Sequence, residues 1–359
     1  MLKKMIAIIT SVIILLTPIQ ASAVTWGEIL TGLQASDTFT SGETAAARTS
    51  EGEYVISGGK IDDPVEVSEL LQFSDSLKVL FQNIKIERLN ANEDSGKTIA
   101  VILGSGSEVT DRVNVSAHGK DTNLSLTNEG KMGSLNAIVH NQAQAAIKNN
   151  GEITGGMNNE VHGEGSRLEF VNDKEGRITG GMDNGVSEKG ELVFTNNGTI
   201  SGEHLFNGAF DGGMLKNTNN GTINVTNVTN ESLHNYARGG GSFVESTNNG
   251  TINGGVMNQA NYGGSRNVAA NHGTVNGQYE FYTGDGGEVV GENNGTVNSL
   301  YAGADGGQVS AVNNGKVKEE IRADASHVSM KADVTVINNG EADRMYVSAG
   351  ENGTLNVEN

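Results

Sequence analysis

Three aspartates that share the same two following residues are the candidates of this chain best placed for chemistry. Asp211, Asp285 and Asp305 each precede Gly-Gly, and the last two are one repeat of the chain apart. If consecutive repeats stack in identical register, these two carboxylates would lie about 5 Å apart, which suits a retaining glycosidase pair or two ligands of a calcium ion. The alternative that we favour is a plain turn, because Gly240 and Gly263 hold the corresponding place in the intervening repeats.

Tyrosines form a second candidate group. Tyr236, Tyr282 and Tyr301 stand 14, 13 and 14 residues before repeat glycines. Stacked repeats would bring them onto one face, where they could bind sugar rings. The interpretation that we favour places them inside, filling the inner face of a strand, and Tyr279 and Phe281 share the same ambiguity.

The longest interval between repeat glycines holds a mixed cluster. It covers 29 residues, from Gly221 to Gly250, and contains Glu231, His234, Tyr236 and Arg238. A carbohydrate-active enzyme would place its acidic, basic and aromatic residues in such an irregular coil. The cluster is small and lies in Asn-rich sequence, so a binding or structural role is the stronger prediction.

Other residue types indicate no cofactor. The chain has no cysteine, which excludes disulfides, Cys-ligated metals and lipid attachment. Its seven histidines are scattered without the spacing of a metal motif: His118, His140, His162, His204, His234, His272 and His327. Calcium at Asp285 and Asp305 is the one ion that the sequence would suit.

The charge balance argues against two classes of partner. Lys and Arg number 24 against 43 Asp and Glu, a formal net charge of −19. Nucleic acid and anionic lipid are therefore poor partners. With 50 glycines the chain could pass for low-complexity sequence, but its periodicity indicates a folded solenoid.

The first 23 residues have the features of a secretory signal peptide. Lys3 and Lys4 precede an apolar run from Met5 to Leu16, and Ala21-Ser22-Ala23 offers a cleavage site before Val24. The apolar run falls short of the ~20 residues that a spanning helix needs. We therefore expect a secreted or cell-surface protein whose mature chain does not insert into a membrane.

An Asn-Asn-Gly repeat organises the rest of the chain. Successive repeat glycines from Gly130 to Gly340 are 20 to 29 residues apart, about 22 on average. Apolar residues stand six and four positions before most of these glycines, as Leu192 and Phe194 do before Gly198, and Ile or Val stands two positions after. Both patterns have the period of two that is typical of strands with one face inward.

The length of the repeat decides the fold class. About 22 residues hold three short strands and three turns, which is one coil of a parallel solenoid rather than a hairpin. Such variable coils suit an all-β, right-handed parallel β-helix. Asn and Gly are expected at the corners because both tolerate positive φ, and stacked Asn side chains are expected to form ladders.

Four segments follow from these patterns. Residues 1–23 are the signal peptide, and 24–50 an N-terminal cap with a short helix from Trp26 to Leu33. Residues 51–121 form irregular coils, with strands at Glu53–Ser57, Leu77–Ile86, Thr98–Leu103 and Val113–Ser116. Residues 122–359 form the regular repeat.

Asn-Asn-Gly-Thr-Ile/Val at this period, behind a signal peptide, resembles the passenger regions of bacterial autotransporters and filamentous-haemagglutinin-type adhesins. The resemblance covers about Thr122 to Asn359 and implies a pectin-lyase-like β-helix. It departs from autotransporters because only 19 residues follow Gly340, too few for a translocator barrel. It implies an adhesin-like or extracellular structural protein whose partners are glycans or cell-surface proteins. The alternative is an extracellular polysaccharide lyase or glycoside hydrolase of the same fold.

Overall fold

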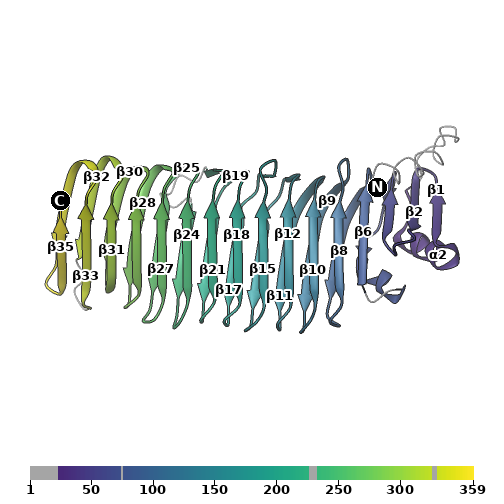
Figure 1. Ribbon diagram of the computed structural model, residues 1–359, viewed down its shortest axis with the longest axis horizontal. Helices are drawn as coiled ribbons and strands as arrows, with labels where there is room; N and C mark the ends of the chain where they lie inside the picture. The colour runs from purple at the N-terminus through teal and green to yellow at the C-terminus, as the bar shows by residue number, and fades with distance from the viewer. Residues whose placement is uncertain (1–22, 74–75, 226–232, 326–329) are drawn as a thin grey trace.

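Parallel strands stacked along one axis build the computed structural model, which describes residues 23–73, 76–225, 233–325 and 330–359 (Figure 1). The chain makes about 13 turns of about 23 residues each. The all-β parallel solenoid predicted from the repeat is therefore confirmed. The signal peptide prediction falls on residues 1–22, outside the described residues.

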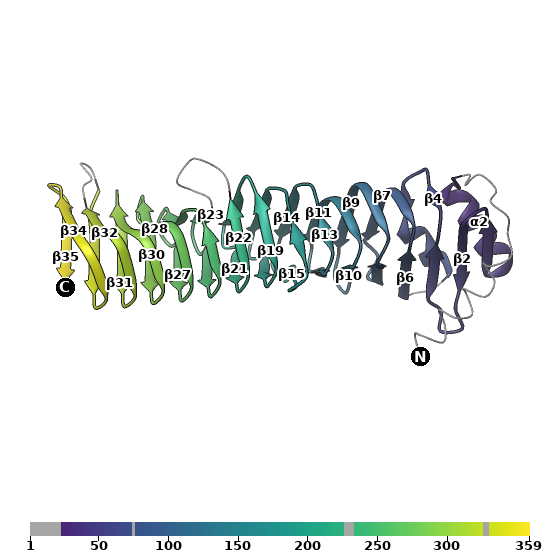
Figure 2. The same ribbon diagram turned by 90° about the horizontal axis from the view of Figure 1, so that it is seen from above.

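Two sheets form the walls of the rod, which Figure 2 shows from above. The first sheet consists of β1 (Thr38–Ser41), β2 (Thr44–Arg48), β3 (Tyr54–Ser57), β6 (Ser76–Gln82), β8 (Thr98–Leu103), β10 (Asn123–Asn128), β12 (Gln144–Asn149), β15 (Arg167–Asn172), β18 (Glu191–Asn196), β21 (Met214–Asn219), β24 (Phe243–Asn248), β27 (Arg266–Asn271), β29 (Glu288–Asn293), β31 (Gly307–Asn313), β33 (Ala332–Asn338) and β35 (Gly353–Glu358).

The second sheet is bent, and in the middle coils each of its strands divides into a short and a longer piece. β11 illustrates the division, because it pairs with both β13 and β14 of the next coil. The sheet consists of β4 (Lys60–Ile61), β5 (Val65–Glu66), β7 (Lys85–Glu93), β9 (Glu108–His118), β11 (Lys131–His140), β13 (Glu152–Ile153), β14 (Met157–His162), β16 (Arg177–Ile178), β17 (Met182–Ser187), β19 (Thr199–Gly202), β20 (Leu205–Phe210), β22 (Thr222–Val225), β23 (Leu233–Arg238), β25 (Thr251–Asn253), β26 (Val256–Asn261), β28 (Thr274–Gly284), β30 (Thr296–Ala304), β32 (Lys316–Ala325) and β34 (Glu341–Ala349).

The strand register stacks like residues on like. Leu192, Phe194 and Asn196 of β18 lie directly on their counterparts in β15, and all three are buried. The first Asn of each corner faces inward and donates from Nδ2 to Oδ1 of the next one at 2.6–2.8 Å, along the series Asn128, Asn149, Asn172, Asn196, Asn219, Asn248, Asn271, Asn293, Asn313, Asn338 and Asn359. The predicted Asn ladder is confirmed.

The corner glycines are required for a different reason from the one that the sequence indicates. None of those from Gly130 to Gly340 has positive φ, so the expectation of left-handed corners was wrong. A Cβ on Gly221 would instead lie 2.1 Å from the carbonyl oxygen of Gly198 in the preceding coil, and one on Gly250 would lie 2.0 Å from that of Gly221. Close stacking of the coils, rather than an unusual backbone angle, excludes a side chain there.

The N-terminal end of the rod carries a helix and antiparallel strands. Helix α2 (Trp26–Ser36) begins with a capping box formed by Thr25 and Glu28, and it extends the predicted helix by three residues. β1, β2 and β3 pair antiparallel beside it. A 3₁₀ helix, η1 (Val67–Phe73), supplies Glu69, whose Oε2 accepts a hydrogen bond of 2.8 Å from Trp26 Nε1.

One predicted strand proves to be two. The run Leu77–Ile86 divides into β6 and β7 at Asn83, whose φ is 51°. No helix in the described ranges is long and apolar enough to span a membrane.

Candidate functional site

Aromatic side chains gather on the outer face of the second sheet at β20 and β23. Alternate residues of β20 and β23 face outward, so Phe206, Phe210, His234 and Tyr236 are half-exposed. Ring centroids are 5.5 Å apart for Phe206 and His234 and 5.9 Å apart for Phe210 and Tyr236, in edge-to-face arrangements. We call these four residues the aromatic patch.

A glycine lets the rings of the patch lie low on the sheet. Gly208 stands between Phe206 and Phe210, and a Cβ there would lie 2.6 Å from Phe210 Cε2 and 2.7 Å from Phe206 Cε1. Both rings therefore occupy the space above Gly208. The patch presents ring surface to solvent instead of isolated side-chain tips.

The interior behind the patch is polar. Asn207, Asn235 and Asn258 face inward, are fully buried and form a second Asn ladder, with Nδ2 to Oδ1 distances of 2.8 Å. Across the core, Ser246 Oγ accepts a 3.0 Å hydrogen bond from Asn235 Nδ2, and Asn217 Nδ2 donates to Asn235 Oδ1 at 3.4 Å. In these coils the strand register directs rings outward and amides inward.

Polar side chains at the rim of the patch are held by its own residues. Gln259 Oε1 lies 3.0 Å from His234 Nε2, and Asn261 Nδ2 donates to the Tyr236 hydroxyl at 3.3 Å. The Arg238 guanidinium lies 5.1 Å from the ring centroid of Tyr262, which is 44% exposed. Amide, hydroxyl and guanidinium groups thus surround an aromatic surface.

The patch coincides with the irregular coil singled out from the sequence. His234, Tyr236 and Arg238 of that cluster share the outer face of β23. Glu231 lies outside the described residues. Phe206 and Phe210 were missed because they stand one coil earlier, and only the strand register reveals that they adjoin His234 and Tyr236.

Comparisons of the chain with protein-family models, with curated proteins and with solved structures found no match.

The expectation that the tyrosines fill the core was wrong. Tyr236, Tyr282 and Tyr301 all face outward and are half-exposed, whereas Tyr279 and Phe281 of β28 are buried. A residue shift along β28 separates the two sets, because successive side chains point to opposite faces.

Tyr282 and Tyr301 belong to a second, more polar cluster. Tyr301 lines a hollow of about 340 Å³ with neighbours that include Glu280, Glu320 and Arg322. Its ring lies over Gly303, and the Arg322 guanidinium is 5.8 Å from the ring centroid. Burial raises the pKa of Tyr301, and the carboxylates of Asp324 and Glu280 raise it further.

The Tyr282 phenol also stays protonated. Burial raises its pKa, and its hydroxyl donates a hydrogen bond to Asp305 Oδ2, which raises the pKa again. A phenol held in this state is a hydrogen-bond donor and a poor general base at neutral pH.

The aspartates do not stack as a pair. The register of β28 on β30 sets Tyr282 beside Gly303 and Thr283 beside Ala304, so Asp285 and Asp305 are offset by one residue. The turn alternative describes Asp211 and Asp285 well, because both are exposed with φ of 48° and 54°. No group of three or more His, Asp or Glu side chains converges as a metal site in the described part of the chain.

Three histidines are not scattered, contrary to the sequence interpretation. His118, His140 and His162 occupy one column on β9, β11 and β14, with ring centroids 4.8 and 4.5 Å apart. His162 Nε2 lies 3.2 Å from Glu160 Oε2 and its Nδ1 lies 2.8 Å from Ser187 Oγ. Burial lowers the pKa of His140, and the neighbouring His162 and His118 lower it further.

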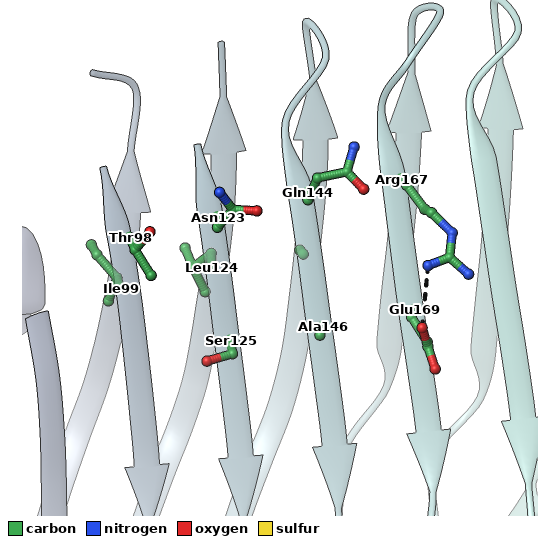
Figure 3. Close-up of a pocket in the computed structure, with 10 residues that line it drawn as sticks. Thr98, Ile99, Asn123, Leu124, Ser125, Gln144, Ala146, Arg167 and Glu169 are labelled. Carbon is green, nitrogen blue, oxygen red and sulfur yellow. Dashed lines mark hydrogen bonds and ion pairs between the residues drawn. The ribbon is translucent and has the colours of Figure 1, made fainter. Parts of the chain in front are cut away.

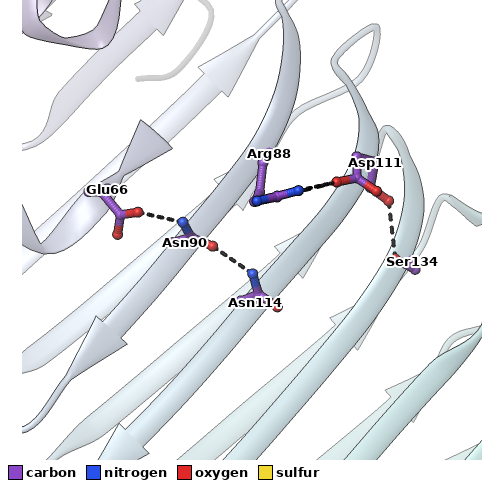
Figure 4. A network of polar contacts seen from close by, with 6 residues as sticks. All are labelled: Glu66, Arg88, Asn90, Asp111, Asn114 and Ser134. Atoms are coloured by element: carbon purple, nitrogen blue, oxygen red, sulfur yellow. Dashed lines mark hydrogen bonds and ion pairs between the residues drawn. The ribbon is translucent and has the colours of Figure 1, made fainter. Parts of the chain in front are cut away.

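Beside this histidine column the outer face carries ladders of polar side chains (Figure 4). Asn114 Nδ2 donates to Asn90 Oδ1 at 2.6 Å, and Asn90 donates to Glu66. Arg88 and Asp111 form an exposed ion pair at 2.7 Å. These contacts are satisfied within the sheet, which leaves no ring surface here for a ligand.

The first sheet offers a shallow hollow of about 220 Å³ (Figure 3). Its floor is made of short side chains such as Ser125 and Ala146, and its rim includes Arg167. The Arg167 guanidinium is already paired with Glu169 and Glu191, each at 3.2 Å. This surface brings together no group suited to catalysis.

Proposed function

We propose that this chain is an exported, adhesin-like solenoid that binds carbohydrate through the aromatic patch. The observation that carries the proposal is the inversion of polarity in β20 and β23. Phe206, Phe210 and Tyr236 face solvent although the buried positions beside them are occupied by Asn207 and Asn235. Burying the rings would stabilise a solenoid more than burying amides, so their exposure is better explained by a ligand.

The chemistry of the patch suits a sugar. Aromatic faces take the apolar C–H faces of pyranose rings, and the polar groups of Gln259, Asn261 and Arg238 can hydrogen-bond hydroxyls at the rim. A net charge of −19 disfavours polyanionic chains at long range, so the proposed ligand is a neutral glycan.

Location supports the same role. A secretory signal peptide would deliver the mature chain outside the cell, where glycans of cell surfaces are available. The resemblance of the Asn-Asn-Gly repeat to adhesin passengers agrees with such a protein, and the β-solenoid fold is compatible with it.

Binding accounts for the site better than cleavage does. The offset of Asp285 and Asp305 removes the paired carboxylates that a retaining hydrolase needs. The pKa of Tyr301 and that of Tyr282 are raised, so both phenols are donors rather than bases.

The test is a binding assay of the chain from Val24 on a panel of neutral and acidic polysaccharides, with new chain ends measured in parallel. Tyr236→Ala should weaken retention about tenfold or more, since an aromatic anchor at the centre of a site carries much of the affinity. The matched control is Tyr346→Ala, which removes a 50% exposed tyrosine from β34, another strand of the same sheet.

Circular dichroism should show both variants folded. Equal retention of Tyr236→Ala and the parent would contradict the patch as the binding site. New chain ends would replace binding by cleavage as the function.

A further inference from the structure

The second Asn of each corner precedes a glycine, and this dipeptide has a characteristic reaction. The glycine main-chain nitrogen can attack the Asn side-chain carbon because no Cβ of the following residue blocks the approach. The reaction needs a mobile Asn side chain and a glycine N–H that is free to approach it. The solenoid provides these two conditions unequally at its corners.

Most corners hold both groups. The N–H groups of Gly221, Gly250, Gly295 and Gly315 each donate to the inner Asn carbonyl of the preceding coil, at 2.9–3.1 Å. The preceding Asn side chains are joined to one another across the coils: Asn220 to Asn197 and Asn249 to Asn220 at 2.8 Å, and Asn314 to Asn294 at 2.9 Å. We call this exposed series the outer ladder.

The corner at Asn150 and Gly151 lacks both restraints. Among the described residues, neither the side-chain amide of Asn150 nor the N–H of Gly151 makes a hydrogen bond. The residues that follow the inner Asn at the adjoining corners are Glu129 and Asp173, so the outer ladder does not extend here. Asp173 is already paired with Lys148 at 2.8 Å. Asn150 is half-exposed and open to water.

We propose that Asn150 is the corner at which the folded protein first loses a side-chain amide. The nitrogen of Gly151 forms a bond to Cγ of Asn150, the Cγ–Nδ2 bond breaks, and ammonia leaves with the proton from the glycine nitrogen. Water then opens the succinimide ring at either carbonyl and gives aspartate or isoaspartate. No electrons are transferred, and water is the only co-reactant.

The product matters at this position. A carboxylate at residue 150 would stand between Glu129 and Asp173, so three acidic side chains would occupy one column of adjoining coils. Isoaspartate would also lengthen the main chain by one carbon at a corner where each coil must fit closely on the last. The modification therefore loosens the stacking between β12 and β13 in an ageing molecule.

Peptide mapping by mass spectrometry of the folded mature chain, aged at mildly alkaline pH, tests the proposal. Conversion at residue 150 should be roughly tenfold faster than at residues 220, 249 and 314, the effect of about 1.4 kcal/mol in the barrier from the missing hydrogen bonds. Asn197 and Asn339 should fall between, because their side chains are bonded to the outer ladder while Gly198 and Gly340 donate no N–H bond. Equal rates at all corners of the folded chain, or fastest loss at residue 220, would overturn the proposal.

Two variants and one control separate structure from local sequence. Glu129→Asn offers Asn150 a ladder neighbour and should slow its conversion, whereas Asn220→Ala removes the partner of Asn249 and should speed conversion there. In denaturant the corners should convert at similar rates. If residue 150 remains fastest by the same factor in denaturant, the local sequence is the cause and the structural explanation fails.

Discussion

Two stretches of the second sheet place asparagine on opposite sides of the wall. In β7 and β9 the amides of Asn90 and Asn114 form a ladder outside, and the inward residues are aliphatic. In β20 and β23 the amides of Asn207 and Asn235 form a ladder inside, and aromatic rings lie outside. Residue type alone therefore does not tell whether Asn builds the core or the surface of a solenoid; the strand register does.

The first sheet shows where the interior changes. Phe170 and Phe194 stack in the core with ring centroids 5.6 Å apart, and the next position in the same column is Asn217. Buried apolar burial stabilises the earlier coils directly, whereas the later coils depend on hydrogen bonds being complete.

The largest effect is expected from a charge in the apolar interior. Phe194→Asp should destabilise the fold by more than about 4 kcal/mol and leave the chain unfolded, because a buried carboxylate finds no partner between coils. Leu192→Asp should behave in the same way. Urea denaturation followed by circular dichroism measures the effect. Val193→Asp, one residue away on the outer face of β18, is the control and should remain folded.

Breaking the inner ladder should cost less than a buried charge, yet far more than breaking the outer one. Asn235→Leu leaves Asn207 Nδ2, Asn258 Oδ1 and Ser246 without their partner, at a cost of roughly 2–4 kcal/mol. Asn114→Leu changes an exposed contact and should cost less than about 0.5 kcal/mol. Similar losses in urea midpoint for the two variants would remove the distinction between the stretches.

The smallest effect concerns pH. Because the folded pKa of His140 is lowered, the unfolded chain binds a proton more readily, and stability is lost as the pH falls through the unfolded value of about 6.5. His140→Gln should reduce the fall in urea midpoint between about pH 8 and about pH 5. His272→Gln, an exposed corner variant, should not change it. A pH dependence identical in His140→Gln and the parent would contradict this role for the histidine column.

Much of the fold could be predicted from local pattern. The alternation of Leu192 and Phe194 before each corner, and of Ile or Val after it, identified strands and their inward faces correctly. The same approach failed at β23, where Leu233, His234, Asn235 and Tyr236 offer an apolar or aromatic residue to each face. Either register satisfies the pattern, and the core interpretation of Tyr236 was wrong for that reason.

The sequence by itself determined the parallel solenoid and its Asn ladder, because a repeat near 22 residues cannot bury its apolar positions except by stacking on its own copies. Only the tertiary structure decided which residues of different coils became neighbours. Bulges in β28 and β30 offset Asp285 from Asp305, and equal spacing aligned His118, His140 and His162. A single residue of shift moves a side chain to another rung or to the opposite face, so the site depends on the register of all the coils between.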